Sequence, residues 1–254
     1  MNVTRREFLK AGAAAAALCL AGPSGAFASG PRLPVLLYHD ISDQFDDVYT
    51  VSPSVFSAQM EWLYWQGFEA VSLAEAARRG GNLEKKVVIT FDDGYVSFMD
   101  YAFPALEEYG FKCTINIIGR YVGRYISRDG ARPVLSWDEC RYLDESGTAE
   151  FGCHTYDLHS RGRLAARSKE ALREDLARFQ EEFRRQMGRS TDILAWPFGV
   201  YDRESVEVAR EAGFRYLLTS EEGRFEPGSL ESIPRINISN RLDMISFQQY
   251  IEGI

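Results

Sequence analysis

The chain has 254 residues, of which 45% are hydrophobic and 26% charged, which is the ordinary composition of a globular protein. Its formal net charge of −8 argues against nucleic acid or an anionic membrane as a partner, because both would repel it. The same charge is compatible with a neutral substrate, or with a substrate whose product becomes cationic.

Residues 1–28 are predicted to be an export signal. Paired arginines at 5–6 are followed by a short alanine-rich stretch at 11–22, and then by the small-x-small pattern of a cleavage site at 26–28. These features are typical of twin-arginine export. The apolar stretch is too short to span a bilayer comfortably, so we expect no stable membrane insertion after cleavage. The mature domain, residues 29–254, is expected to be periplasmic or extracellular and to carry a net charge near −10, because the signal carries +2.

Eight short apolar runs are predicted to be strands, and helix-forming segments lie between them. The predicted strands cover residues 34–38, 69–71, 86–91, 112–118, 148–153, 193–196, 216–219 and 233–238. The predicted helices cover residues 53–65, 136–146, 168–187 and 202–213, each with a serine or aspartate able to cap its start. This alternation favours an α/β fold in which about seven or eight parallel strands form a closed or nearly closed (β/α) barrel; a doubly wound open sheet is the alternative. In both folds, functional groups belong at the carboxyl ends of the strands.

Three cysteines lie in the predicted mature domain: Cys113, Cys140 and Cys153. Their odd number and the lack of a CxxC pair argue against a zinc ribbon and against a disulfide scaffold. Buried free thiols are therefore expected. One bridge, between Cys140 and Cys153 or involving Cys113, stays open as an alternative, because spacing alone does not decide it.

All three histidines of the chain follow predicted strands, and so does a pair of adjacent aspartates, Asp92 and Asp93. His39 follows the first strand, and His154 and His159 follow the fifth. A separation of five residues would point two side chains about 140° apart on a helix, so His154 and His159 are expected on a loop, where they can converge. One aspartate and two histidines make a facial set that binds a catalytic divalent cation; zinc suits these donors best, although iron, cobalt or nickel is also compatible.

Three motifs give the chain a specific resemblance. The sequences FDDGY at 91–95, HT at 154–155 with His159 downstream, and WPFG at 196–199 resemble, in order and spacing, the first three motifs of the polysaccharide deacetylase family (carbohydrate esterase 4, the NodB-homology domain). The resemblance extends from His39 to about residue 238. It implies a distorted (β/α) barrel, and a metal-dependent hydrolase that removes N-acetyl groups from polysaccharides containing N-acetylglucosamine.

The resemblance also implies roles for individual residues. Asp92 would be the catalytic base, and the metal ligands would be Asp93, His154 and His159. The backbone N–H of Phe198 would help to bind the oxyanion. Substrate-binding positions are expected at Trp196, Pro197, Phe198 and Tyr95. Outside the motifs, residues 161–167 are expected to form a solvated loop, with a place at the border of a cleft as the alternative.

The chain departs from the common family pattern in two residues, the histidine that acts as general acid and an arginine of the third motif. The five-residue spacing of the metal histidines and the sequence YHD at 38–40 resemble the branch that acts on poly-N-acetylglucosamine, but no histidine follows His159 to serve as a late general acid. We hypothesise that His39 donates the proton to the leaving amine, with Asp40 or another carboxylate supporting its charge. The alternative for His39 is a structural imidazole beneath the loops.

Ala195 stands where many members of the family have an arginine. We hypothesise that Arg235 orients Asp92 in its place; the alternative is that Arg235 pairs with some other carboxylate.

Two rival functions also stay open. One is a metal-dependent amidase or esterase that acts on another substrate, and the other is a barrel that binds polysaccharide without turning it over. The polymer itself is not predicted, because many glycans share the same acetamido group.

Overall fold

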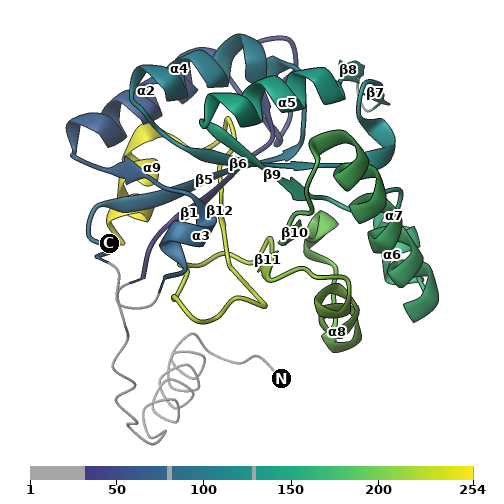
Figure 1. Ribbon diagram of the computed structural model, residues 1–254. Helices are drawn as coiled ribbons and strands as arrows, with labels where there is room; N and C mark the ends of the chain where they lie inside the picture. The colour runs from purple at the N-terminus through teal and green to yellow at the C-terminus, as the bar shows by residue number, and fades with distance from the viewer. Residues whose placement is uncertain (1–31, 79–81, 128–129, 254) are drawn as a thin grey trace, which may run out of the picture. The chain divides into compact units, whose positions relative to one another are not determined.

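The computed structural model describes residues 32–78, 82–127 and 130–253, so the predicted signal and its cleavage site lie outside the described residues. Eight strands form one parallel sheet in the order β11–β10–β9–β6–β5–β1–β12, and β4 pairs with the start of β5 (Figure 1). All eight predicted runs are strands of this sheet: β1 (Val35–Tyr38), β4 (Glu69–Ala70), β5 (Lys86–Asp93), β6 (Cys113–Ile117), β9 (Ala149–Cys153), β10 (Ile193–Ala195), β11 (Tyr216–Leu218) and β12 (Ile236–Asn237).

The sheet curves until its two edges approach each other. Ile233, which precedes the edge strand β12, forms a parallel bridge with Leu218 of the opposite edge strand β11. The backbone N–H of Thr219 donates to the carbonyl of Ile233 at 2.9 Å, and the N–H of Ile233 donates to the carbonyl of Leu217 at 2.8 Å. The predicted distorted (β/α) barrel is confirmed.

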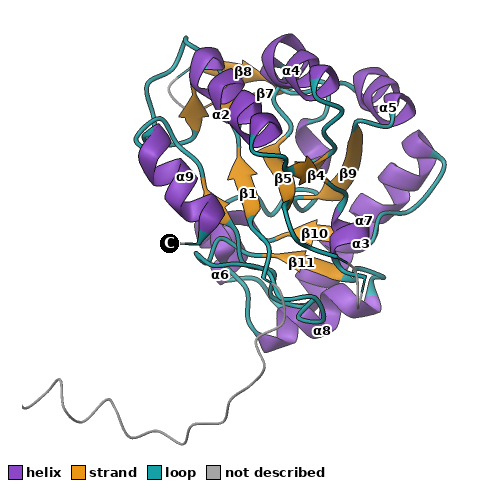
Figure 2. Ribbon diagram, turned by 90° about the vertical axis from the view of Figure 1, so that its left-hand side faces the viewer, coloured by secondary structure: helices purple, strands orange, loops and turns teal. Residues whose placement is uncertain are grey.

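Helices pack around the sheet (Figures 1 and 2). They are α2 (Pro53–Trp65), α3 (Leu73–Ala76), α4 (Phe103–Glu108), α5 (Trp137–Ser146), α6 (Arg161–Ala165), α7 (Lys169–Met187), α8 (Arg203–Glu211) and α9 (Met244–Glu252). The four predicted helices correspond to α2, α5, α7 and α8. Their predicted caps are present; for example, Ser136 accepts from the N–H of Glu139, whose carboxylate accepts in return from the N–H of Ser136.

Short elements complete the fold. Two pairs of short strands were not predicted: the parallel pair β2 (Asp40–Ile41) and β3 (Thr50–Val51), and the antiparallel hairpin of β7 (Tyr125–Ser127) and β8 (Ala131–Pro133). A π-helical turn, η1 (Phe98–Ala102), leads into α4, and two 3₁₀ turns follow strands, η2 (Gly119–Tyr121) and η3 (Pro197–Gly199).

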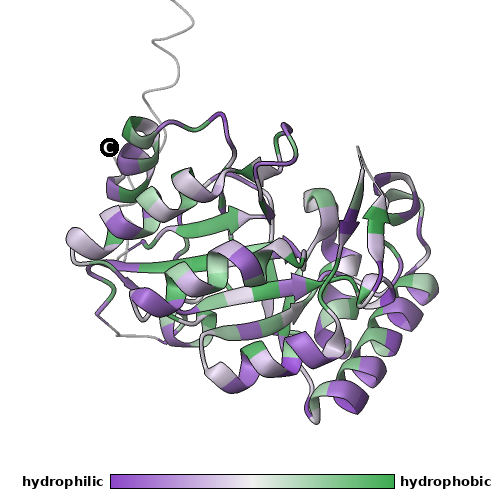
Figure 3. Ribbon diagram, turned by 90° about the horizontal axis from the view of Figure 1, so that it is seen from above, coloured by the Kyte–Doolittle hydropathy of each residue, from purple (hydrophilic) through white to green (hydrophobic). Residues whose placement is uncertain are grey.

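Side chains alternate between the two faces of the sheet. In β5, Ile89 and Phe91 belong to the large apolar cluster that packs against the helices, whereas Val88 belongs to a smaller cluster inside the barrel. Strands that are buried on both faces read as continuous apolar runs, and Figure 3 shows the strands as largely hydrophobic between helices with hydrophilic stretches. The period of two places Thr90 and Asp92 on the inner face with Val88. The last residues of β5 therefore bring carboxylates to the mouth of the barrel.

Candidate metal centre and active site

A cleft of about 200 Å³ opens at the carboxyl ends of the strands. Side chains from several strand ends reach it, as expected for a parallel barrel. Its lining includes all three histidines of the chain and both aspartates of the pair, together with Tyr49, Arg161, Phe198, Ser220 and Glu222. Residues separated by more than a hundred positions in the sequence thus meet in one place.

Asp93, His154 and His159 form the one group of metal-binding side chains found among the described residues, and their ligand atoms all lie within 4.8 Å of one another. Asp93 Oδ1 is 3.2 Å from His159 Nε2 and 3.7 Å from His154 Nε2. Metal–ligand distances of about 2.0–2.2 Å suit donors spaced in this way. Two imidazoles and one carboxylate therefore fit a divalent cation, as the sequence predicted for a metal site.

Two turns with positive φ shape this cluster. Asp93 (φ 72°) and Gly94 (φ 73°) end β5 in left-handed conformations, which turn Asp93 away from the face that Asp92 occupies. A Cβ atom on Gly94 would lie 2.8 Å from Ile117 Cγ2, so only glycine fits beside β6. Thr155 (φ 67°) makes a similar turn after β9, and the rings of His154 and His159 come to 5.0 Å between centroids.

The surroundings of His154 suit a neutral metal ligand. Its Nδ1 lies 2.8 Å from the carbonyl oxygen of Ala195, so Nδ1–H donates to that oxygen and Nε2 is left facing Asp93. Burial, only partly offset by the charge of Asp92, lowers the pKa of His154 to about 4. The imidazole is consequently neutral at physiological pH, with a lone pair on Nε2.

Asp92 is held by three hydrogen bonds. Arg235 donates from Nη1 to Oδ1 at 2.8 Å and from Nη2 to Oδ2 at 2.7 Å, and Asn116 Nδ2 donates to Oδ1 at 2.8 Å. Burial acts to raise the pKa of Asp92, but the charge and hydrogen bonds of Arg235, together with the nearby His154 and His39, outweigh it and hold the pKa well below its usual range. Asp92 Oδ2 is 3.9 Å from His154 Nε2, so this oxygen faces the metal-binding cluster.

Asn116 was missed by the sequence reasoning, although it is a polar residue in the middle of the apolar strand β6. The register of the sheet places Asn116 directly beside Asp92 on one side and Gly152 on the other. A Cβ atom on Gly152 would lie only 2.2 Å from Asn116 Oδ1. The glycine therefore makes room for the amide that supports Asp92.

His39 lies at the end of β1 and lines the cleft together with both aspartates. Its ring is 5.1 Å from that of Tyr49, in an edge-on arrangement. Asp40, which was expected as a candidate partner for His39, is bonded elsewhere: Oδ1 accepts from Ser97 Oγ, and Oδ2 accepts from Arg132 Nη1 at 2.9 Å. We therefore do not assign Asp40 to the support of His39.

The predicted substrate-binding residues divide into two groups. Phe198 lines the cleft, and its ring lies 4.9 Å from that of His159. Trp196, Pro197 and Tyr95 are buried and do not line the cleft. Tyr95 Oη donates instead to Asp93 Oδ2 at 2.9 Å. Of these four side chains, Phe198 is the one placed to touch a substrate.

Residues 161–165 form the short helix α6, so the prediction of a loop is wrong for this segment. Arg161 nevertheless lines the cleft, in agreement with the alternative of a cleft border. Its guanidinium group lies 5.9 Å from the centre of the Phe198 ring. This contact makes Arg161 part of the same wall as Phe198.

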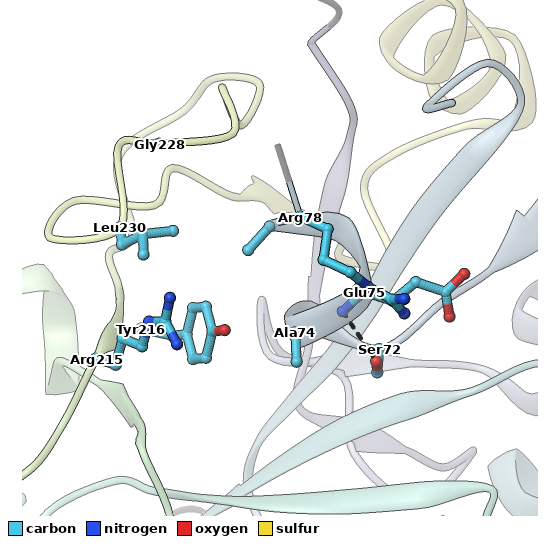
Figure 4. A pocket seen from close by; sticks show the side chains of 9 residues that line it. Ser72, Ala74, Glu75, Arg78, Arg215, Tyr216, Gly228 and Leu230 are labelled. Atoms are coloured by element: carbon cyan, nitrogen blue, oxygen red, sulfur yellow. Dashed lines mark hydrogen bonds between the residues drawn. The ribbon is translucent and has the colours of Figure 1, made fainter. Parts of the chain in front are cut away.

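A larger cavity of about 720 Å³ lies elsewhere, between α3, the start of β11 and the loop around Gly228 (Figure 4). Its lining includes Arg78, Arg215 and Tyr216, with Glu75 as its one carboxylate and no histidine or cysteine. This donor set does not suit a metal ion. Cavity size therefore does not single out the candidate active site, whereas the metal-binding side chains of the smaller cleft do.

The three described cysteines, Cys113, Cys140 and Cys153, are free and buried, as expected. Burial raises the pKa of each thiol well above its usual value. Thiols in this state are poor nucleophiles and poor ligands. The cysteines are therefore part of the core and not of the site.

The family profile described as polysaccharide deacetylase matches residues 79–217. The chain belongs to the polysaccharide deacetylase family. The profile of the twin-arginine translocation signal sequence matches residues 2–22, which confirms the predicted export. None of the helices in the described residues is long and apolar enough to cross a membrane.

Two relatives and one solved structure show the range of similarity. The poly-beta-1,6-N-acetyl-D-glucosamine N-deacetylase of Escherichia coli (strain K12) is 27% identical over 252 residues, which cover 84% of this chain and 38% of the relative. The enzyme of the same name from Staphylococcus aureus (strain MSSA476) is 28% identical over 201 residues, which cover 76% of this chain and 69% of the relative. The structure of IcaB from Ammonifex degensii superposes with a TM-score of 0.75 at 26% identity, covering 88% of this chain and 97% of that chain.

Proposed function

We propose that this polysaccharide deacetylase removes N-acetyl groups from polysaccharide containing N-acetylglucosamine, and that it needs a divalent cation held by Asp93, His154 and His159. The observation that carries the proposal is the convergence of these three ligands with Asp92 at one cleft. The activity for which the two relatives are named supports the choice of an N-acetylglucosamine polymer. Zinc suits the nitrogen and oxygen donors best, ahead of iron, cobalt and nickel.

Asp92 is proposed as the catalytic base. When bound, a divalent cation polarises a carbonyl group and makes water a better nucleophile at neutral pH. Asp92 is ionised at that pH, because its pKa lies well below the usual range, so it can accept a proton. Oδ1 accepts from both Asn116 and Arg235, whereas Oδ2 accepts from Arg235 alone and faces the metal ligands. We therefore place the accepted proton on Oδ2, with Arg235 as the residue that orients the carboxylate.

His39 is proposed as the general acid that protonates the leaving amine. It is the histidine of the cleft that does not belong to the metal-binding group. Across the cleft, the backbone N–H of Phe198 is proposed to donate to the oxyanion. Phe198 has φ 58°, a conformation that costs a non-glycine residue free energy. Residues in such conformations cluster at functional sites, where the surrounding structure holds them in place.

The mature protein is proposed to be residues 29–254, released by cleavage after Ala28 into the periplasm or the extracellular space. N-terminal sequencing of the exported protein tests this boundary. We propose an N-acetylated polysaccharide or oligosaccharide as the partner, and neither nucleic acid nor a membrane.

A panel of acetylated oligosaccharides, assayed for acetate with and without added zinc, tests the activity. Asp92→Asn is expected to abolish acetate release and to retain metal, whereas Asp93→Asn is expected to lose the metal. Identical behaviour of the two variants would contradict this division of roles. His39→Ala is expected to retain metal and lose turnover; near-normal turnover would leave His39 as a structural imidazole.

The same panel separates the rival functions. Metal binding without acetate release from any N-acetylglucosamine oligomer would favour a different amide or ester substrate, or a barrel that binds polysaccharide without hydrolysing it. Release of acetate from other acylated compounds identifies the first of these, and retention on a polysaccharide column without turnover identifies the second.

A further inference from the structure

The two carboxylate oxygens of Asp93 have different surroundings. Oδ1 faces the imidazoles, 3.2 Å from His159 Nε2 and 3.7 Å from His154 Nε2. Oδ2 accepts a hydrogen bond of 2.9 Å from the phenol of Tyr95. Both side chains are buried, with 1% of Asp93 and 2% of Tyr95 exposed. One oxygen is thus directed at the metal-binding cluster, and the other at a buried donor.

We propose that Tyr95 is a positioning residue that fixes Asp93 as a one-oxygen metal ligand. The inference rests on the proposed function in assuming that a cation binds at this cluster. A hydrogen bond from a phenol to an ionised carboxylate is stronger than one between neutral groups, so it can hold the rotation of the carboxylate about χ2. The left-handed turn at Asp93 and Gly94 brings Tyr95 back over the residue that it holds.

Tyr95 is itself fixed by the β7–β8 hairpin. Tyr95 forms an isolated antiparallel bridge with Val134, and the next N–H, that of Val96, donates to the carbonyl of Pro133 at 2.9 Å. On the inner side of the hairpin, the guanidinium of Arg132 lies 5.7 Å from the centre of the Tyr95 ring. The phenol is therefore held by backbone pairing and by packing.

Arg132 is in turn fixed by its own partners. It is 1% exposed and donates to Asp40 at 2.9 Å and to Thr50 at 3.1 Å, and it also pairs with Asp47. The ring of Phe45 lies 3.9 Å from its guanidinium carbon. Both terminal nitrogens of the guanidinium are bonded, and these bonds restrain Arg132 behind the Tyr95 ring.

Without the phenol, the carboxylate of Asp93 loses the hydrogen bond that fixes Oδ2, so either oxygen can turn toward the imidazoles. The carboxylate would then have to be fixed in one orientation when the metal binds, and the entropy lost in this step would lower the metal affinity. Loss of a group that orients a metal ligand typically lowers metal affinity about 10- to 100-fold. We expect a decrease of this size for Tyr95→Phe.

The experiment compares Tyr95→Phe with the matched control Tyr38→Phe. Tyr38 is also fully buried, and its hydroxyl donates to Gln59 Oε1 at 2.8 Å, but on the side of the sheet that packs against α2. Both substitutions delete one oxygen atom and one buried hydrogen bond. Zinc affinity of the metal-free proteins is measured by competition with a chromophoric chelator, and circular dichroism checks the fold.

We expect weaker zinc binding in Tyr95→Phe, and a dissociation constant within about twofold of wild type in Tyr38→Phe, since that phenol touches no metal ligand. Equal affinities of Tyr95→Phe and wild type would overturn the inference, as would an equal loss in both variants. An unfolded Tyr95→Phe protein would also overturn it, because the phenol would then be required by the fold and not by the metal ligand. A wild-type protein that binds no divalent cation would instead overturn the proposed metal dependence.

Discussion

Replacing Arg235 with methionine removes the cation that compensates Asp92 inside the barrel. Arg235 has no exposed surface and Asp92 is 2% exposed, and two hydrogen bonds of 2.7 and 2.8 Å join them. Removing one partner of a buried ion pair typically costs about 3–5 kcal/mol, because the other charge stays buried without compensation. We expect Arg235→Met to lower the free energy of unfolding by about this amount at pH 7.

The loss should depend on pH in a defined direction. In the wild type, the pKa of Asp92 lies well below its value in an unfolded chain, which is about 3.9. The ionised carboxylate therefore stabilises the fold fully above about pH 3.9, and this stabilisation is lost as the pH falls through the pKa of the folded state. In the variant, burial without Arg235 raises the pKa of Asp92. Protonation then relieves the buried charge as the pH falls. The difference in unfolding free energy between the two proteins should therefore be largest near pH 7 and should shrink toward pH 4.

Urea unfolding of the metal-free proteins, followed by circular dichroism at pH 7 and at pH 4.5, measures this difference. Arg173→Met is the matched control, because Arg173 pairs with Glu211 at a similar 2.8 Å on the exposed surface, where solvent screens the pair. The control should change stability far less than Arg235→Met. A loss below about 1 kcal/mol for Arg235→Met, or the same loss at both pH values, would refute the reasoning.

Two further predictions concern neighbours of Asp92. Gly152→Ala would place a Cβ atom 2.2 Å from Asn116 Oδ1 and 2.8 Å from Ile193 Cγ2, so we expect it to lower the free energy of unfolding by about 1–3 kcal/mol and to slow acetate release. Gly162→Ala in α6 is the control and should be tolerated, because a Cβ atom there meets nothing within 4 Å. Equal effects of the two substitutions in urea unfolding and acetate assays would contradict this prediction. Burial lowers the pKa of His154 from 6.5 to about 4, so the unfolded chain binds an extra proton between these values, and the metal-free protein should lose stability as the pH falls through this range. Urea midpoints of the wild type and His154→Gln as a function of pH measure this loss, and parallel curves would count against it.

The strands were predictable because a parallel sheet covered on both faces leaves continuous apolar runs in the sequence. The two pairs of short strands, β2–β3 and β7–β8, could not be predicted. β7 and β8 have three residues each, and the one buried residue of β8 is Arg132, whose partners Asp40 and Asp47 lie more than 80 positions away. No local pattern in the sequence signals a charge that becomes buried in this way.

The metal-binding residues of the site were predictable from the sequence, whereas the residues that hold the two aspartates in place were less so. Histidine is rare in this chain, so its three positions at strand ends were conspicuous, but Asn116 reads as one polar residue in an apolar run. Its closeness to Asp92 follows from the pairing of β5 with β6, which no single segment encodes. Tyr95 was predicted to contact substrate because it lies in a motif; the turn at Asp93 directs it to Oδ2 instead.

The two adjacent aspartates differ in how their charges are compensated. Asp92 has a permanent partner in Arg235, so this buried pair carries no net charge. Asp93 faces His154, which is neutral at physiological pH, and His159. A metal ion binds imidazole in its neutral form, so the three ligands would contribute one negative charge and a bound divalent cation would leave a net positive charge beside Asp92. In the proposed mechanism, a site with that balance would favour the negative charge that develops on the acetamide oxygen, and Asp92 would stay available to take a proton.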